Sequence, residues 1–446
     1  MDREIYERIR HAGVVGAGGA GFPTHVKVDC EVEYVIANGA ECEPLLRVDQ
    51  QLAAVYAKEL IEGLRAMMRC TCAKEGVILL KGHYHEAIDA LQKLTRNIKD
   101  IRLHLIETSF YPAGDELQVI YEVTGRVVPT GGLPKDVGCV VSNVATMINV
   151  ARAMQGKPVI TKEITVGGAV LTPCTLTVPI GTPMQDLIEY AGGTTEKECV
   201  YLLGGPCMGS IVNKLDSITV TKTSGGLFAL PKDHPLLEKK SAEINIKVMQ
   251  SVCCQCSMCT QMCPRNALGL NVQPHKAMRT IANGGNLLGE VNGIFSCCDC
   301  GICTYVACNF GLKPNQIMKR VKGVLAAQGV KPVKEQKYPA DRFALSKRVP
   351  TERMIARMGL EQYNVPAPLY SVQIKPEYVR IPLKMHTGAP ATPVVAAGDR
   401  VTAGVLIADV AENALGAKIH ASINGTVTAV TQQYIEITAD KNGDNA

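Results

Sequence analysis

Ten of the eighteen cysteines in this 446-residue chain lie in two short bursts, and this feature restricts the fold more than any other. The first burst has the spacing C-x2-C-x2-C-x3-C-P and ends on Pro264. The second repeats C-x2-C-x2-C, but four residues precede its last cysteine and no proline follows it. The cysteines at these positions are Cys253, Cys256, Cys259 and Cys263 in the first burst, and Cys297, Cys300, Cys303 and Cys308 in the second.

This spacing is typical of chains that hold two [4Fe–4S] clusters, because three close thiolates bind one cluster and a distant fourth cysteine binds the other. The pattern therefore predicts two ligand sets that exchange their fourth member. We expect one set to be Cys253, Cys256, Cys259 and Cys308, and the other to be Cys297, Cys300, Cys303 and Cys263. Cys254 and Cys298 fall outside the pattern, either as spare buried thiols or because the ligand register is shifted.

Zinc sites and disulfides explain these cysteines less well. A zinc site takes four ligands and has no use for a third cysteine at this spacing. A disulfide framework is typical of small secreted chains, whereas this chain is large and shows no secretory signal. A protein that holds two such clusters moves single electrons, so the sequence predicts an electron-transfer function.

Composition sets the domain count and excludes several functions. Domains usually hold roughly 100–200 residues, which predicts about three domains here. More than half of the cysteines lie in the cluster motifs, which indicates that the protein resides in a reducing cytoplasm. No apolar run approaches the ~20 residues of a membrane helix, so we expect no membrane span. Aromatic residues are only 4% of the chain and no nucleic-acid module is present, so we expect no nucleic-acid partner.

Residues 313–357 are strongly basic, whereas the rest of the chain is slightly acidic. Such a stretch can be a docking face for an acidic partner. A solvated linker surface is the commoner explanation, and both alternatives stay open at this point.

The pattern of strands and helices predicts a multidomain α/β protein. In the N-terminal part we expect helices at 2–12, 49–68 and 85–96, and strands at 32–37, 77–80 and 101–107. Strands that alternate with helices predict a parallel sheet, here in a Rossmann-like domain at 1–155. A small β-grasp module follows at 156–240, and a helical two-cluster ferredoxin-like domain at 241–330. A basic linker without a fold of its own is expected at 331–375, and a β barrel-sandwich module at 376–440.

Four glycines lie within six residues, and they predict a phosphate site. Gly16, Gly18, Gly19 and Gly21 leave backbone amides open to an anion at the expected junction with a helix. The spacing G-x-G-G-x-G differs from the dinucleotide-binding G-x-G-x-x-G, and a tight packing loop is the alternative.

The chain then resembles a known family in four ordered stretches. The segment from Gly16 to Lys27 is similar to the flavin loop of the NADH-binding subunit of respiratory complex I, and it is closer still to the RnfC family. Three further stretches match in order: NGAECEP at 38–44, YPAGDE at 111–116 and SNVAT at 142–146. The β-grasp segment (the SLBB domain of the family), the two cluster motifs and the C-terminal position of the last β module resemble PduS-type cobalamin reductases of bacterial microcompartments.

The resemblance implies an FMN site that also receives NADH. The residues implied to hold these molecules are Gly16, Gly18, Gly19, Gly21, Phe22, Lys27, Asn38, Glu41, Glu43, Tyr111, Gly114, Asp115, Glu116, Asn143 and Thr146. Phe22 and Glu43 match NADH contacts, and the others match flavin contacts. The chain departs from the complex I protein at Ala17, Cys30 and Ala40, where that protein has an arginine, a phenylalanine and an aspartate.

The resemblance also implies an activity. NADH would supply electrons, and FMN and two [4Fe–4S] clusters would pass them to a corrinoid that binds transiently. No side chain is expected to act as a catalytic acid or base, because the cofactors supply the chemistry. The implied location is a microcompartment in the cytoplasm, with an adenosyltransferase or a shell protein as possible partner. The alternative is an electron relay that delivers electrons to a protein partner in a shell or in an RnfC-like membrane complex.

Overall fold

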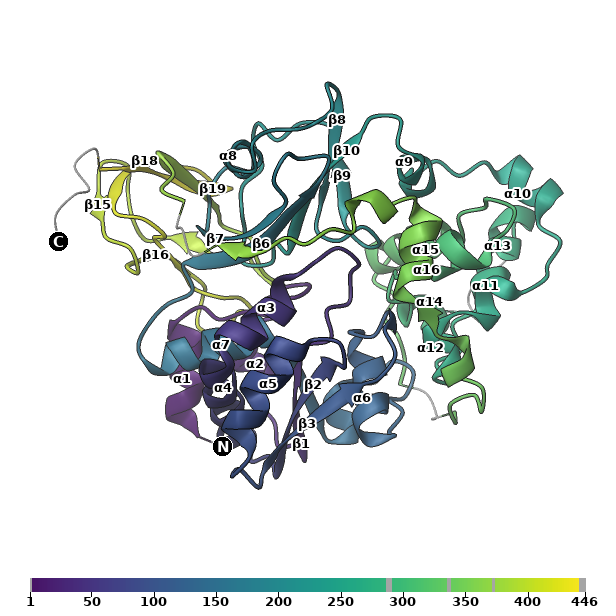
Figure 1. Cartoon of the computed structure of the whole chain (residues 1–446), viewed down its shortest axis with the longest axis horizontal. Helices are drawn as coiled ribbons and strands as arrows, with labels where there is room; N and C mark the ends of the chain where they lie inside the picture. Colours follow the sequence, from purple (N-terminus) through teal and green to yellow (C-terminus); the bar gives the residue numbers. More distant parts are fainter. Residues whose placement is uncertain (1, 286–290, 335–337, 371–373, 441–446) are drawn as a thin grey trace.

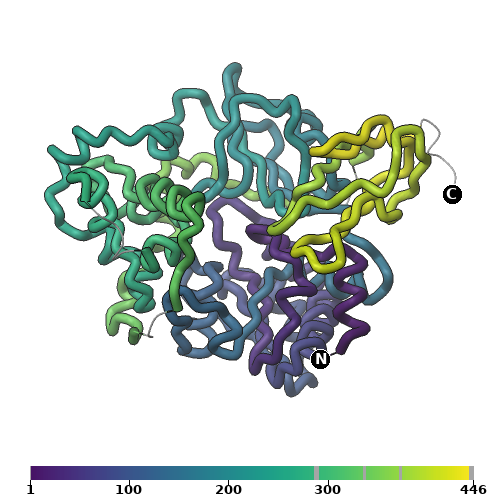
Figure 2. The backbone as a smooth tube through the Cα atoms, turned by 180° about the vertical axis from the view of Figure 1, so that it is seen from behind, coloured from purple at the N-terminus to yellow at the C-terminus, as the bar shows by residue number. Residues whose placement is uncertain are grey.

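The computed structural model describes residues 2–285, 291–334, 338–370 and 374–440, and they form four modules (Figure 1). The β-grasp module lies against the N-terminal α/β domain, and the cysteine-rich module and the C-terminal β module lie on opposite sides of these two. Figure 2 shows the same arrangement from behind. No helix in the described part of the chain is long and apolar enough to cross a bilayer.

The N-terminal domain is built on a parallel sheet with the strand order β3-β2-β1-β5. Its strands are β1 (Tyr34–Asn38), β2 (Glu75–Lys81), β3 (Ile101–Ile106) and β5 (Cys139–Asn143), and β4 (Phe110–Tyr111) lies outside the sheet. Its helices are α1 (Arg3–His11), α2 (Thr24–Lys27), α3 (Val48–Val55), α4 (Ala57–Cys70), α5 (His85–Thr95), α6 (Glu116–Thr124) and α7 (Val144–Met154), with a 3₁₀ turn at Pro134–Val137. The predicted parallel sheet is confirmed.

Strands β1, β2 and β5 are buried on both faces, which explains why they are largely apolar, whereas the edge strand β3 carries the exposed residues Arg102 and Leu105. Successive side chains of β1 point to opposite faces. Val35 and Ala37 belong to a core that includes α4, α7 and the C-terminal module. Ile36, between them, belongs to a second core that includes α6 and the cysteine-rich module. The sheet therefore joins three modules through two separate cores.

The single helix predicted at 49–68 was wrong in one respect. The chain forms α3 and α4, which are separated at Tyr56, where the backbone leaves helical geometry (φ −111°, ψ 34°). The Arg152 guanidinium lies 4.9 Å from the centre of the Tyr56 ring. The break gives α3 its own direction, and α3 then buries Val48 and Asp49 toward the functional cavity.

The β-grasp module contains a six-stranded sheet with the order β12-β7-β6-β10-β8-β9. Its elements are β6 (Thr161–Gly168), β7 (Cys174–Pro179), α8 (Met184–Tyr190), β8 (Cys199–Leu203), β9 (Ser210–Val212) and β10 (Gly226–Pro231), together with β12 (Leu369–Tyr370) from much later in the chain.

The cysteine-rich module is helical, as predicted. It contains α9 (Pro235–Lys240), α10 (Ile246–Val252), α11 (Met258–Gln261), α12 (Pro264–Ala267), α13 (Pro274–Asn283), α14 (Val291–Phe295), a π-helical turn (Cys303–Ala307) and α15 (Pro314–Ala327). Helix α13, which lies between the two cysteine bursts in sequence, packs against α15, which follows the second burst.

The expectation of a linker without a fold at 331–375 was wrong. Its described residues include 3₁₀ turns at Leu345–Lys347 and Glu361–Tyr363, β11 (Val349–Pro350), α16 (Thr351–Met358) and β12. The reason is hydrophobic burial, because Met354, Ile355 and Met358 enter a core shared with the cysteine-rich module. Strand β11 pairs with β4 and β12 pairs with β7, so this segment fastens the first two modules together.

The C-terminal module consists of two small sheets, as predicted for a barrel-sandwich. One sheet has the order β13-β19-β18-β15 and the other has the order β14-β16-β17. The strands are β13 (Tyr378–Pro382), β14 (Thr392–Pro393), β15 (Arg400–Val401), β16 (Leu406–Asp409), β17 (Ile419–His420), β18 (Gly425–Val430) and β19 (Tyr434–Ala439).

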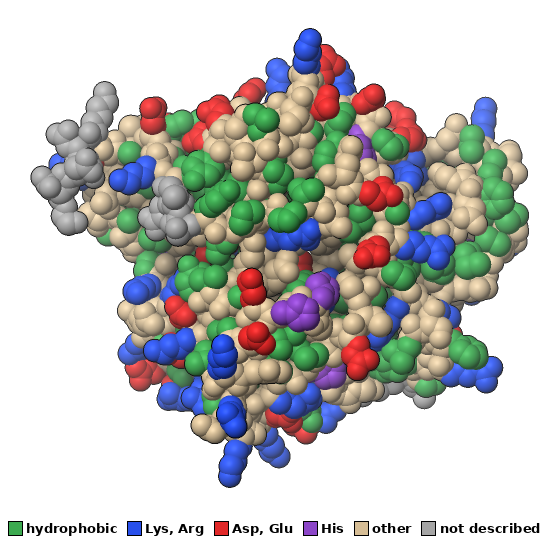
Figure 3. Space-filling model, viewed as in Figure 1, with side chains coloured by type: hydrophobic (Ala, Val, Ile, Leu, Met, Phe, Trp, Pro, Cys, Tyr) green, Lys and Arg blue, Asp and Glu red, His purple; other side chains and the backbone are tan. Residues whose placement is uncertain are grey.

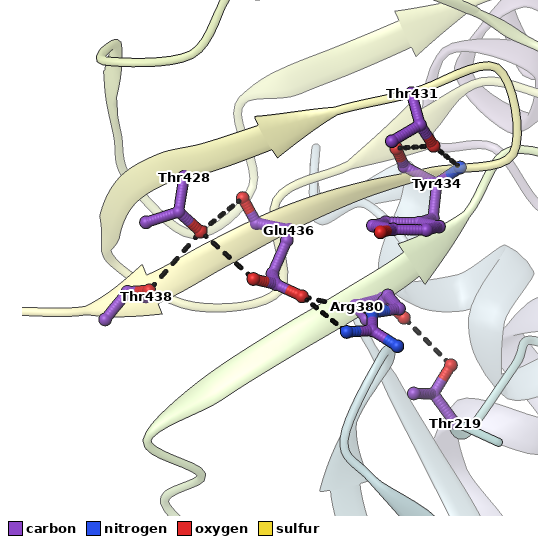
Figure 4. A network of polar contacts seen from close by, with 7 residues as sticks. All are labelled: Thr219, Arg380, Thr428, Thr431, Tyr434, Glu436 and Thr438. Carbon is purple, nitrogen blue, oxygen red and sulfur yellow. Dashed lines mark hydrogen bonds and ion pairs between the residues drawn. The ribbon is translucent and has the colours of Figure 1, made fainter. Parts of the chain in front are cut away.

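A polar network ties the C-terminal module to the β-grasp module (Figure 4). The Arg380 guanidinium on β13 donates to Glu436 on β19 at 2.9 and 3.0 Å and stacks on Tyr434. The carbonyl oxygen of the same Arg380 accepts a hydrogen bond from Thr219 of the β-grasp module at 2.8 Å. Arg380 therefore holds the two strands together and also contacts the neighbouring module.

Candidate functional site

The glycine loop follows α1 and leads into the short helix α2. The amide of Ala17 donates to the hydroxyl of Thr146 at 2.9 Å, and the ammonium of Lys162 donates to the Ala17 carbonyl at 3.0 Å. These two contacts fix the loop against α7 and the β-grasp module. A Cβ at Gly18 would lie 2.8 Å from the side-chain nitrogen of Asn143 and would displace that side chain, whereas a Cβ at Gly19 would meet open space.

A cavity of about 330 Å³ lies under this loop, and we call it the glycine-loop cavity. It is lined by all of the residues predicted to hold flavin or NADH except Glu41, Glu43 and Tyr111. Its other lining residues are Ala20, Thr24, Cys42, Pro112, Val141, Ser142, Met208, Cys298 and Cys300. Phe22 is 37% exposed. Segments that are far apart in sequence thus meet around one space.

A second cavity of about 320 Å³ adjoins it and shares Gly18, Asn38 and Asn143 with it. We call it the acidic cavity, because Glu41, Glu43 and Asp49 line it beside the single cation Lys162. Glycines of the β-grasp module close it on the other side: Gly204, Gly205, Gly209 and Gly225. The two cavities are therefore neighbours, and both are lined by residues of the N-terminal domain and of the β-grasp module.

Burial shifts the ionisation of the acidic cavity toward the neutral forms. Burial raises the pKa of Asp49 to about 6, although the hydrogen bond from Asn143 at 2.7 Å and the charge of Lys162 oppose the shift. Burial, and then the charge of Asp49, raise the pKa of Glu41. Desolvation lowers the pKa of Lys81 and of Lys162. Reasoning from the sequence missed Asp49, Lys81 and Lys162, because each lies in an ordinary helix or strand pattern without a motif.

Glu43 and Tyr111 support the site from outside the glycine-loop cavity. The Glu43 carboxylate accepts hydrogen bonds from the amides of Cys207 and Met208 at 2.7 and 2.8 Å, so it holds a β-grasp loop in place. The Tyr111 side chain is 1% exposed, and its hydroxyl donates to the Cys300 carbonyl at 2.9 Å. Both residues connect the predicted flavin segments to other modules.

The neighbouring carboxylates Asp115 and Glu116 bind different partners. Asp115 accepts two hydrogen bonds from the Arg265 guanidinium, at 2.5 and 2.7 Å, and the Asp115 and Arg265 side chains are mostly buried, with exposed fractions of 9% and 15%. Glu116 accepts from the Lys27 ammonium at 2.7 Å. One acid therefore contacts the residue after Pro264 of the first cysteine burst, and the other contacts the helix that follows the glycine loop.

The two cysteine bursts adopt the same backbone conformation. Gln255 and Ser257, on either side of Cys256, have φ of 60° and 57°, and Asp299 and Gly301, on either side of Cys300, have φ of 57° and 76°. A positive φ is costly for residues other than glycine and is often found at functional sites. Its repetition at matching positions indicates that both loops are shaped to point several side chains at a common centre.

The structure brings together around one cavity the four cysteines predicted for one of the two sets. A cavity of about 280 Å³, the distal cavity, is lined by Cys253, Cys256, Cys259 and Cys308. Cys303, from the other predicted set, lies near Cys297 and Cys263 and also near Cys259 of the distal cavity. Cys300 lies near Cys298, Cys263 and Cys303. The one-residue excess before Cys308 is absorbed by the π-helical turn Cys303–Ala307, which holds one more residue than an α-helical turn would.

The chemistry of these thiols fits a cluster better than a single ion. No group of three or more His, Cys, Asp or Glu side chains in the described residues is close enough for one metal ion. Burial, with nearby Cys308 and Cys253, raises the pKa of Cys259 to about 12, and burial raises that of Cys263 to about 12. Such thiols ionise together only beside a large positive charge, which iron supplies.

The second burst lies beside the glycine-loop cavity, because Cys298 and Cys300 line that cavity directly. We therefore call the set with Cys300 the proximal set. Cys298, outside the motif, is hydrogen bonded to Cys300, and this contact is the main cause of its lowered pKa. Cys254, also outside the motif, is exposed and lines the distal cavity.

Several cations of the basic stretch 313–357 form hydrogen bonds or ion pairs with other parts of the chain. Lys322 donates to the Cys297 carbonyl at 2.8 Å, and Lys313 pairs with Glu238 at 2.9 Å. Arg348 pairs with Glu122 on α6. On the face seen in Figure 3, basic and acidic side chains are interspersed. Lys319 and Arg320 are exposed, and they pair with no acid in the part of the chain that the structure describes.

Comparison with family models assigns all four modules. The Nuo51 FMN-binding domain matches residues 9–152, and the SLBB domain matches 164–209. The 4Fe-4S dicluster domain matches 252–313, and the RnfC barrel sandwich hybrid domain matches 364–443. The expected flavin and iron–sulfur modules are thereby confirmed.

Two curated relatives match over almost the whole chain. Cobalamin reductase PduS of Salmonella typhimurium (strain LT2) is 44% identical, and the match covers 97% of this chain and 96% of the relative. The chain belongs to the PduS cobalamin reductase family. The PduS protein of Citrobacter freundii is 41% identical over 97% of this chain and 96% of its own length. A component of the Na⁺-translocating ferredoxin:NAD⁺ oxidoreductase complex of Acetobacterium woodii is 36% identical over 61% of this chain and 60% of its own.

Proposed function

We propose that this protein is an NADH-dependent reductase that passes electrons through FMN and two [4Fe–4S] clusters to a corrinoid. One observation carries the proposal: the cavity under the glycine loop is also lined by Cys298 and Cys300 of the second cysteine burst. A flavin site and an iron–sulfur site that share a wall can exchange electrons directly. When bound, the flavin accepts a two-electron hydride and releases single electrons, which the clusters carry.

The glycine loop and the start of α7 would hold the flavin phosphate. Gly19 faces open space beside Gly18, and the α7 N-terminus favours an anion. Lys27 lies at the same cavity, although Glu116 offsets its charge. Asn38 donates to the Gly114 carbonyl at 2.9 Å, which keeps the two flavin-motif segments together.

NADH would enter beside Phe22. This ring is partly exposed at the cavity, as a stacking residue for a base or nicotinamide should be. Glu43, on the wall of the adjoining acidic cavity, is the other residue that the resemblance assigns to NADH.

The two cysteine sets would hold the clusters as the spacing predicts. The proximal set, Cys297, Cys300, Cys303 and Cys263, would take electrons from the flavin side. The distal set, Cys253, Cys256, Cys259 and Cys308, would take them from the proximal set.

The corrinoid acceptor comes from the relatives, because both PduS proteins are named cobalamin reductases. A microcompartment location, and an adenosyltransferase or shell protein as partner, belong to the same proposal. NADH oxidation coupled to reduction of two cobalt(II) centres is balanced, since NADH yields NAD⁺, a proton and two electrons.

A relay to a protein partner is the second candidate, and exposed apolar side chains beside the distal cavity favour it. Phe310 and Met258 line that cavity and are 51% and 40% exposed. Apolar groups at the rim of a redox site are typical of a docking surface.

An anaerobic visible titration of the loaded protein with NADH tests the proposal. We expect the flavin band to bleach first and the cluster absorbance to fall next, and cob(III)alamin added afterward should reoxidise both. Bleaching without reoxidation by a corrinoid would favour the relay. Cluster absorbance that does not respond to NADH would contradict the NADH-dependent function.

A further inference from the structure

A large groove runs between the β-grasp module and α15, outside the two cavities already described. Its volume is about 990 Å³. Its lining residues come from β8, β9, the segment around α9, the second cysteine burst and α15. We call it the basic groove.

The charge of the lining is positive. Four cations line the groove, Lys232, Lys240, Lys319 and Arg320, against the single acid Asp299. Lys232 pairs with Glu198 at 3.4 Å, whereas Lys319 and Arg320 pair with no acid among the described residues. A concave surface with one sign of charge concentrates ligands of the opposite sign.

The loop around Cys207 and Met208, which lines the groove through Met208, is held by hydrogen bonds. The Lys240 ammonium donates to the carbonyls of Pro206 and Cys207 at 3.1 and 3.0 Å. The amides of Cys207 and Met208 are held in turn by Glu43. This loop therefore has a fixed shape where it lines the groove.

The groove lies beside the electron path. Asp299, in its lining, stands between Cys297 and Cys300 of the proximal set. Met208 lines the basic groove and also both cavities at the flavin site. A ligand in the groove would thus rest against the loop of the proximal set.

We propose that the basic groove binds the electron acceptor, and that its cations recognise a phosphate group on a large, otherwise polar small molecule. This rests on the proposed function, in which the acceptor is a corrinoid. Cobalamin fits this chemistry, since its nucleotide arm carries a phosphodiester and its ring carries polar amides. The amide, hydroxyl and methionine groups of the lining suit such a surface.

The test measures binding to the loaded, full-length protein under anaerobic conditions by equilibrium dialysis. The probes are cob(II)alamin and cobinamide, a corrinoid that lacks the nucleotide arm and its phosphodiester. The variant is Lys319→Glu/Arg320→Glu. The matched control is Lys93→Glu/Arg96→Glu, an exposed Lys–Arg pair on the N-terminal domain.

We expect the groove variant to weaken cob(II)alamin binding about tenfold or more and cobinamide binding less than about threefold, because reversed charges repel the phosphate. Higher salt should reduce the difference in cob(II)alamin affinity between the groove variant and the wild type, because salt screens the charges. Flavin bleaching by NADH should be unchanged in both variants.

Cob(II)alamin binding as tight in the groove variant as in the wild type would overturn the proposal, and so would equal weakening of both corrinoids. Slower transfer to a protein acceptor alone would also overturn it and would assign the groove to the relay. If the wild type reduces a dye with NADH but binds neither corrinoid, the proposed corrinoid function itself fails.

Discussion

At the scale of single residues, two adjacent carboxylates divide their work between modules. Asp115 pairs with Arg265 of the cysteine-rich module, whereas Glu116 pairs with Lys27 of α2, the helix that follows the glycine loop. The YPAGDE motif therefore joins the flavin segment to the iron–sulfur segment, in addition to lining the cavity. The sequence identified both residues but gave no means of finding Arg265 as a partner, because 150 positions separate it from Asp115.

Removing one partner of the buried Asp115–Arg265 pair should destabilise the protein strongly. We expect Arg265→Gln to lower the free energy of unfolding by about 3–5 kcal/mol, because it leaves a buried carboxylate without its counter-charge. Chemical denaturation of the anaerobic protein measures this, and a double-mutant cycle with Asp115→Asn isolates the pair.

The control is Arg102→Gln, whose partner Glu75 lies in a largely exposed pair. Its loss should cost at most about 1 kcal/mol. Equal effects of the two substitutions would show that the buried pair has no special role in joining the modules.

At the scale of elements, the two cysteine loops have the same backbone conformation, but different residues adopt its positive φ angles. The position after the central cysteine is Ser257 in one loop and Gly301 in the other, with φ of 57° and 76°. A Cβ at Gly301 would overlap the Tyr305 ring, so this loop requires glycine for space as well as for φ. The cysteine spacing shows that the two loops are related, but it does not show why only the second loop has a glycine at this position.

Gly301→Ala should therefore disrupt the proximal set selectively. The added methyl group displaces Tyr305 and strains the backbone, which should cost about 1–3 kcal/mol locally. We expect iron and sulfide content to fall toward half, with the flavin retained. Ser257→Gly is the matched control, since it relieves the same backbone conformation in the distal loop, and it should keep both clusters. Full iron content in Gly301→Ala would contradict the claim that this position requires glycine.

The helix break at Tyr56 shows a limit of periodicity at this scale. The apolar spacing across 49–68 fits one helix, but the chain breaks at Tyr56, and Asp49 on the separate helix α3 lines the acidic cavity. Only packing in three dimensions could decide this, because each half is a good helix separately.

At the scale of the whole molecule, one buried lysine joins three modules. Lys222 lies in the β-grasp module and donates at 2.7 Å to the Gly13 carbonyl of the N-terminal domain and at 2.7 Å to the Lys418 carbonyl of the C-terminal module. Burial lowers the pKa of Lys222 to about 7. The amine donates in either protonation state, so the junction persists on both sides of neutral pH.

Lys222→Met should loosen this junction. Two buried carbonyls lose their donor, which should lower the free energy of unfolding by about 2–4 kcal/mol. Because the pKa of Lys222 is lowered on folding, the wild type gains stability as the pH rises from about 7 toward 10, and the methionine variant lacks this gain.

Thermal unfolding at pH 6.5 and pH 8.5 measures both effects. Lys214→Met, at an exposed lysine of the same module, is the control and should change little. A loss of stability that is the same at both pH values would contradict the lowered pKa, and no loss would contradict the role of the junction.

The sequence by itself determined the modules, the parallel sheet and the chemistry. Spacing within each cysteine burst, the four glycines and the alternation of strands and helices are local patterns, and local geometry dictates their outcome. The expected exchange of fourth cysteines between the bursts stays a prediction, and the position of Cys308 in the wall of the distal cavity supports it.

Only the tertiary structure decided which modules share a wall. Contact between Cys300 and the glycine-loop cavity, the burial of α16 and the pairing of Asp115 with Arg265 join segments separated by many residues. Such contacts are selected by hydrophobic burial and charge compensation across the whole molecule. For this reason the sequence predicted an electron carrier, whereas the adjacency of its two redox sites had to come from the fold.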